Sequence, residues 1–203
     1  MAVDVRTSDA ANGQPSDIRI DTAGSVTVTS GAAVIIDSNN DVTNGGKISI
    51  SNANDASGIM VTGPRIADIV NVGTITIDET YTPTDTDNDG DLDGLFAIDQ
   101  GRTVIKIDCA LTGNINHSGA ILVEGNQSVG VAVVDVSGNV RLAGEIYVKG
   151  VGSLGAVLSG NLSGALRVQS AITATSYRTV PAPSDTSRLD ADDLLQGGRP
   201  PRI

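Results

Sequence analysis

The chain has 203 residues, a formal net charge of −11 and an aromatic content of only 2%, with no tryptophan. Nucleic acids and anionic membrane surfaces are bound through basic patches, so this charge argues against both as partners. The lack of large rings excludes an ordinary core built around aromatic side chains, and it favours a narrow core of Val, Ile, Leu and Ala.

Residues 1–17 are polar and rich in turn-forming residues, and we expect them to form a lead-in segment or cap. Alternation of apolar and polar residues begins at Asp17. It predicts short strands over 18–20, 25–29 and 33–36, separated by glycines.

One apolar pattern is written three times between Gly113 and Thr175, as GNINHSGAILVEGNQSVG, GNVRLAGEIYVKGVGSLG and the shorter GALRVQSAITAT. Gly119 and Gly144 are equivalent and lie 25 residues apart (144 − 119). Such a period with β-branched residues is typical of a β-solenoid, whose units bury a core only by stacking on their neighbours. The sequence therefore predicts an all-β parallel β-helix with coils of about 25 residues, spanning residues 18–176.

Aligned on the small residue, the copies place aliphatic side chains in three columns that should form ladders inside the tube. The columns are Ile115, Val140 and Leu166; Ile121, Ile146 and Ile172; and Val123, Val148 and Ala174.

The same register appears upstream in NDVTNGGKISI (40–50) and ADIVNVGTITI (67–77). From Gly73 to Gly119, however, the spacing is 46 residues (119 − 73). Either one coil is enlarged there, or a second coil is poorly marked.

Residues 78–94 contain seven acids and no base, which predicts an acidic loop protruding from the tube. Within it, oxygen-bearing side chains alternate, with Gly90 at the sixth position, an arrangement that resembles the calcium loop of an EF-hand. Phe96 stands where the bidentate glutamate of that loop belongs, and a plain solvated acidic loop is the alternative. The predicted metal site is a structural calcium site at Asp85, Asp87, Asp89, Asp91 and Asp93.

No catalytic constellation is visible in the sequence. His117 shares its column with Asn44 and Asn71, which indicates packing or turn chemistry, and no nucleophile motif accompanies it. Cys109 is the only cysteine, so neither a disulfide nor a paired-thiol metal site is expected. The three glutamates, which are Glu79, Glu124 and Glu145, occupy different columns, so the carboxylate pair of a glycosidase is not apparent.

After Thr175 the register is lost. Residues 177–203 are predicted to form an irregular tail with a short helix that begins at Ser187 and ends near Gly197. This tail offers no evident apolar face to cover the last coil.

Four stretches resemble the passenger region of bacterial autotransporters of the sphingomonad or alphaproteobacterial type. They are VRTSDAANGQPSDIRI, AVIIDSNNDVTNGGKISISNANDASGI, GTITIDETYTPTDTDNDGDLDG and SRLDADDLLQGG. The resemblance implies type V secretion through the outer membrane, a right-handed parallel β-helix, and a C-terminal membrane barrel beyond the present chain. It carries over no catalytic residues.

We therefore expect a non-enzymatic passenger at the cell surface or outside the cell, acting as a stalk or an adhesin that binds a surface or matrix component. Two alternatives stay open: a carbohydrate-active β-helix enzyme, and a solenoid that self-associates end to end through exposed strand edges.

Overall fold

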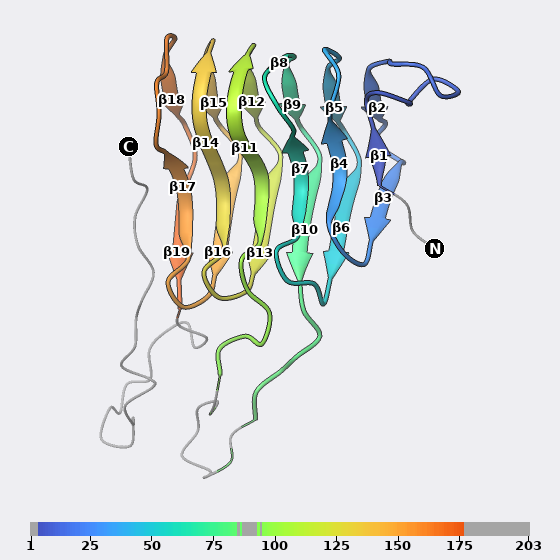
Figure 1. The fold of residues 1–203 in the computed structure, drawn as a ribbon. Helices are drawn as coiled ribbons and strands as arrows, with labels where there is room; N and C mark the ends of the chain where they lie inside the picture. The colour runs from blue at the N-terminus through green and yellow to red at the C-terminus, as the bar shows by residue number, and fades with distance from the viewer. Residues whose placement is uncertain (1–3, 85, 87–92, 94, 177–203) are drawn as a thin grey trace.

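The computed structural model describes residues 4–84, 86, 93 and 95–176. These residues form a parallel β-solenoid of about six turns with coils of about 26 residues (Figure 1). No helix occurs in the described part of the chain. The predicted all-β parallel fold is confirmed.

Each coil crosses three parallel sheets. The first sheet contains β2 (Ile18–Ile20), β5 (Val42–Asn44), β9 (Ile69–Asn71), β12 (Ile115–His117), β15 (Val140–Leu142) and β18 (Leu166–Val168). The second contains β3 (Ser25–Val28), β6 (Lys47–Ser51), β10 (Thr74–Asp78), β13 (Ala120–Glu124), β16 (Glu145–Lys149) and β19 (Ile172–Thr175). The third contains β1 (Val5–Arg6), β4 (Ala32–Ile36), β7 (Ser57–Val61), β11 (Thr103–Thr112), β14 (Val129–Ser137) and β17 (Leu154–Leu158), and β8 (Arg65–Ile66) pairs with the end of β11.

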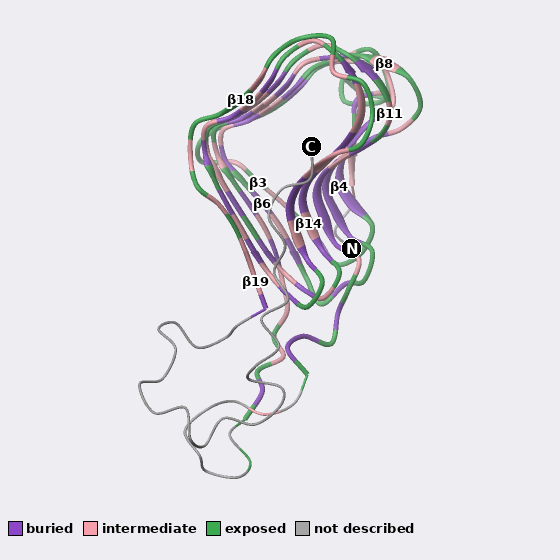
Figure 2. Ribbon diagram, turned by 90° about the vertical axis from the view of Figure 1, so that its left-hand side faces the viewer, coloured by how far each residue is buried: buried purple, intermediate pink, exposed green. Residues whose placement is uncertain are grey.

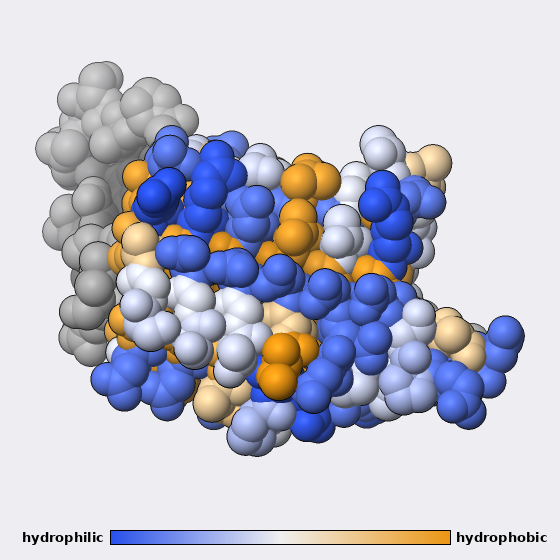
Figure 3. All heavy atoms as spheres, turned by 90° about the horizontal axis from the view of Figure 1, so that it is seen from above, coloured by the Kyte–Doolittle hydropathy of each residue, from blue (hydrophilic) through white to orange (hydrophobic). Residues whose placement is uncertain are grey.

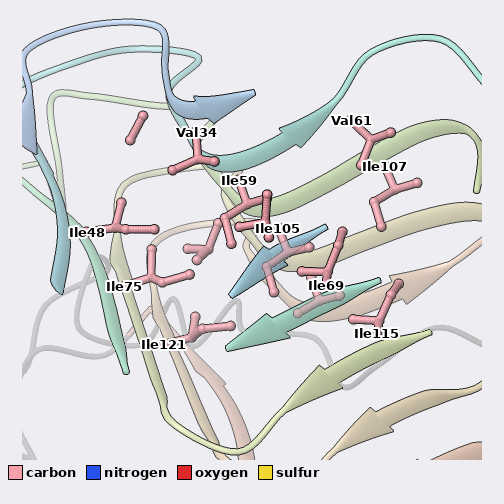
Figure 4. Packing of buried hydrophobic residues seen from close by; sticks show 14 of the residues in the cluster. Val34, Ile48, Ile59, Val61, Ile69, Ile75, Ile105, Ile107, Ile115 and Ile121 are labelled. Carbon is pink, nitrogen blue, oxygen red and sulfur yellow. The ribbon is translucent and has the colours of Figure 1, made fainter. Parts of the chain in front are cut away.

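The core consists of aliphatic ladders that run along the axis of the tube. Buried residues recur at corresponding places in successive coils (Figure 2). Ile48, Ile75 and Ile121 stack in one row and face Ile59 and Ile105 from the third sheet (Figure 4). The strand pairing reproduces the predicted columns, including the alignment of β12 with β15 and of β16 with β19.

Glycines form the corner between the first two sheets because successive coils approach too closely there for a side chain. A Cβ atom on Gly119 would lie 1.9 Å from the backbone oxygen of Gly73, and one on Gly144 would lie 2.0 Å from that of Gly119. The small residue on which the repeat aligns is therefore imposed by backbone contact.

The 46-residue spacing comes from a single enlarged coil. Strand β10 pairs directly with β13, so no coil lies between them. The extra residues form an insert, residues 79–102, between β10 and β11, whereas three to five residues make this connection in the other coils. The insert is longer than the predicted loop over 78–94, because it extends to residue 102, and its last residues already stack on the next coil, where Gln100 bridges to Asn126.

The lead-in over residues 1–17 contributes one short strand. Strand β1 pairs with β4, and a small hairpin follows, in which Ala11 and Gln14 pair across a turn at Asn12 and Gly13. Both turn residues have positive φ, at 52° and 79°, as such tight turns require. The tail over 177–203, with its predicted helix, lies outside the described residues.

Candidate functional site

The base of the insert, which we call the neck, is formed by Glu79, Asp99 and Arg102. Here the chain departs from its repeat, and these charged side chains are buried or nearly so. At the neck, both oxygens of the Glu79 carboxylate accept backbone hydrogen bonds from the returning chain. The Ile98 and Asp99 N–H groups donate to them at 2.9 Å each. The outgoing and returning segments are thereby joined.

The returning segment is also held between the neighbouring coils. Gln100 N–H donates to the Asn54 side chain at 2.8 Å on one side. On the other side, the Asn126 side chain donates to the carbonyl of Ala97 at 2.7 Å. The insert thus starts from a fixed position on the solenoid, projecting beyond the sheet edge at which β10 ends (Figure 1).

Arg102 lies at the centre of the neck and is fully buried. Its Nε donates to the Ala53 carbonyl at 2.8 Å, and another nitrogen donates to the Asp99 carboxylate at 2.6 Å. It also donates to the Glu124 carbonyl and lies 3.6 Å from a Glu79 oxygen. One side chain therefore links two coils and both ends of the insert.

Burial lowers the pKa of Arg102, and the nearby carboxylates of Asp99 and Glu79 oppose that shift. A guanidinium is charged throughout the range in which proteins fold, so the neck holds a permanent cation with two acids. Removing one member would leave an uncompensated buried charge.

Sequence reasoning did not find Arg102, since arginine is ordinarily exposed. The available signal was the enlarged spacing itself, with an acid at the start of the insert and a base at its end.

The predicted calcium ligands lie mostly outside the described residues, namely Asp85, Asp87, Asp89 and Asp91. Asp93 is described, and one of its carboxylate oxygens accepts hydrogen bonds from the backbone and the hydroxyl of Thr86. Within the described part of the chain, no three His, Cys, Asp or Glu side chains gather as a metal site would require. The calcium site stays a prediction.

His117 is buried in a polar ladder inside the tube. Gly46 N–H donates to Asn44 at 3.1 Å, the Asn44 amide donates to Asn71 at 2.7 Å, and the Asn71 amide meets His117 Nδ1 at 3.0 Å. His117 Nε2 then meets the Glu145 carbonyl at 3.2 Å. The predicted packing role is consistent with this position.

The direction of this ladder fixes the protonation state of His117. A carbonyl only accepts, so Nε2 carries the proton, and Nδ1 accepts from Asn71. If the Asn44 and Asn71 amides were flipped, the Asn44 NH₂ group would face the Gly46 N–H. A backbone N–H can only donate, so two donors would then face each other. An imidazolium would therefore leave two buried donors facing each other somewhere in the ladder. Burial accordingly lowers the pKa of His117.

The other candidate residues of the sequence, Cys109, Glu124 and Glu145, do not form a common site. Cys109 is partly buried, its thiol donates to the Gly63 carbonyl at 3.0 Å, and burial raises its pKa. Glu124 pairs in register with Lys149, while Glu145 pairs with Ala120, so these two glutamates occupy different columns as predicted.

An outer ladder of Asp and Asn side chains was also missed. Each side-chain oxygen accepts the backbone N–H of the equivalent residue in the following coil, at 2.6–3.0 Å. The signal was present in the aligned sequence, because each member immediately precedes the first apolar column. The members are Asp17, Asp41, Asp68, Asn114 and Asn139, and the ladder ends at the N–H of Ala165.

The face seen along the upper edge of the solenoid is mostly hydrophilic, with apolar residues in small separate patches (Figure 3). Ile66 and Val72 are exposed at 62% and 54%. Separate apolar residues of this kind are normal on a protein surface. No helix in the described region is long and apolar enough to cross a membrane.

Comparisons with protein-family models, curated proteins and solved structures give no match to this chain.

Proposed function

We propose that the chain is a non-catalytic part of an autotransporter passenger, which serves at the cell surface or outside the cell as a rigid stalk or an adhesin. The observation that carries this proposal is the continuity of the aliphatic ladders through every coil. A solenoid packed in this way is an extended body whose stiffness comes from contacts between neighbouring coils.

A non-catalytic role is supported by the hydrogen bonds that His117, Glu79 and Asp99 already make within the protein. Both ring nitrogens of His117 have partners inside the core, so the imidazole cannot reach a substrate. The Glu79 and Asp99 carboxylates are tied to backbone N–H groups and to Arg102. General acid–base chemistry needs groups that can meet the reacting atoms.

In this proposal the insert is the element that meets a partner. It leaves the tube from a fixed neck, and loops placed on rigid scaffolds are the usual carriers of binding. Its acidic residues suit a basic or cation-bridged surface component.

The test uses cells that carry the native gene and an antibody against this chain. A protease-sensitive band on intact cells, which shifts on heating as a membrane barrel does, is the expected result. A band found only inside intact cells would contradict the proposal. Beads coated with the chain should also adhere to surface material, and beads coated with a variant whose insert is replaced by Gly-Ser should not.

A different measurement distinguishes the carbohydrate-active enzyme from the non-catalytic passenger. Release of reducing ends or unsaturated products from polysaccharides by the pure chain would favour the enzyme and overturn the non-catalytic role.

A further inference from the structure

The outer face of the first sheet carries three arginines in a single column. They are Arg19 of β2, Arg141 of β15 and Arg167 of β18, and the intervening coils place uncharged residues there, namely Thr43, Val70 and Asn116. Arg141 and Arg167 lie directly opposite each other on neighbouring strands, the last two of this sheet in the described part of the chain (Figure 1). A strongly acidic chain thus places two adjacent cations on one face.

The arginine of the first coil has a counter-charge, and the other two do not. Arg19 Nε lies 2.8 Å from a carboxylate oxygen of Asp21, two residues further along the chain. The equivalent positions after the other two arginines are occupied by Ala143 and Gln169. Neither of these two arginines forms an ion pair with a described residue. The column therefore lacks its acid at the place where its cations become neighbours.

Arg141 is held in place by neutral groups from the two adjoining coils. Its Nε donates to the Gln169 side chain at 2.7 Å, and its Nη1 donates to the Asn116 side chain at 2.9 Å. Amide oxygens carry no net charge, so these bonds orient the guanidinium without neutralising it. Its Nη2 has no hydrogen-bond partner among the described residues, and the neighbouring Arg167 is exposed. Both side chains can therefore donate to a ligand.

The placement of two arginines opposite each other is electrostatically unfavourable without a ligand. Like charges directly opposite on neighbouring strands repel and destabilise the pair. The nearest acids along the chain lie on other sheets, because Asp135 belongs to the third sheet and Glu145 to the second. An anion bound by both guanidinium groups would offset the repulsion. Departures from local charge compensation of this kind are expected at functional sites.

We propose that Arg141 and Arg167 bind a carboxylate group of an acidic polysaccharide. The planar guanidinium matches a carboxylate with two parallel N–H donors, which a lysine could not supply. Asn116 occupies the next position of the column, and its amide nitrogen can donate to a hydroxyl of the adjoining sugar unit. The ligand therefore combines one fixed negative charge with neutral hydroxyl groups beside it.

A nucleic acid is a poorer occupant of this face. Duplex DNA carries one negative charge per about 1.7 Å of its axis, and its binding requires many phosphates to be neutralised. The chain offers only this local pair of cations within a net charge of −11, which repels a densely charged polymer. A polysaccharide with isolated carboxylates needs no more than the pair. The inference goes beyond the proposed function and does not depend on it, because the insert follows β10 of the second sheet.

Binding of the full chain to polygalacturonate and to alginate tests the site, with fully methyl-esterified polygalacturonate as the uncharged control. EDTA is present throughout, so that calcium cannot bridge the polymer to the acidic insert. The parent chain should bind the charged polymers and not the ester. Arg167→Gln should weaken this binding at least about tenfold. Its circular dichroism should be unchanged, because Arg167 makes no side-chain bond to a described residue.

Arg19→Gln is the matched control, since it removes the same charge from the same column where Asp21 already neutralises it. This variant should bind like the parent. Equal weakening in Arg19→Gln and Arg167→Gln would overturn the proposal, because it would indicate a general effect of net charge. Absence of binding to both charged polymers would also overturn it. So would tighter binding to a single-stranded oligonucleotide or to dextran sulfate, which would assign the two arginines to a different anion.

Discussion

Acidification should destabilise the solenoid through one side chain, His117. It is the only histidine in the chain, and burial holds its pKa below the ordinary value of 6.5. Above pH 6.5 the residue is neutral in both folded and unfolded chains, and the full stability is present. As the pH falls below 6.5 the unfolded chain takes up the proton first, so stability is lost until the pH has passed the folded pKa.

The size of the loss follows from the polar ladder. When His117 is protonated, its Nδ1–H faces the Asn71 NH₂ group, so two buried donors face each other. Leaving one buried donor unsatisfied costs about 1–3 kcal/mol. For a domain of this size that corresponds to a fall of about 2–4 °C in Tm for each kcal/mol.

The assay is urea unfolding followed by circular dichroism between pH 8 and pH 5, with His117→Leu as the matched control. Leucine occupies the same column in the next coil, as Leu142, so its shape is accommodated. The variant should be less stable than the parent at pH 8, by about 1–3 kcal/mol, because Asn71 and the Glu145 carbonyl lose their partner. That difference should shrink towards pH 5. An equal pH dependence in both proteins would refute the assignment of a neutral, hydrogen-bonded His117.

Three further predictions concern the corner, the neck and the insert. Gly119→Ala places a methyl group against the backbone of the preceding coil and should destabilise the chain by about 1–3 kcal/mol in urea, whereas Ser118→Ala should change little because the next coil carries alanine there. Arg102→Met leaves Glu79 buried without a cation and should cost about 3–5 kcal/mol, partly recovered in the double variant with Glu79→Gln; wild-type stability in the single variant would contradict the neck. Calorimetric titration of the full chain with calcium should show binding that weakens at least about tenfold in Asp87→Asn, and titration without heat or any other sign of binding would refute the calcium site.

The coils were predictable because their information is local and repeated. Ile121 and Val123 are separated by one residue and recur in the next coil as Ile146 and Val148, which marks both the strand and the side that faces inward. The repeat also placed His117 in a column with Asn71, which was enough to favour packing over catalysis.

The neck was not predictable because its contacts lie at a corner whose residues differ from coil to coil. Arg102 meets a carbonyl at Ala53 and another at Glu124, and these partners are brought together only by the stacking of coils. The direction of the buried ladder was likewise hidden, since it depends on the Gly46 N–H group at one end and a carbonyl at the other. Columns show which residues are stacked, but not which atom donates.

The two polar networks differ in what they add to the fold. The outer ladder, in which Asp68 accepts from Asn114, ties each coil to the next and could be extended by any further coil. The neck ties the insert to the solenoid, and a buried ion pair is commonly no more stabilising than well-packed apolar residues of the same size. Arg102 therefore contributes orientation more than stability, because it fixes where the insert leaves and re-enters the tube. A surface loop does not require such a fixed base, and under the proposed function the insert is accordingly the segment in which a partner should first be sought.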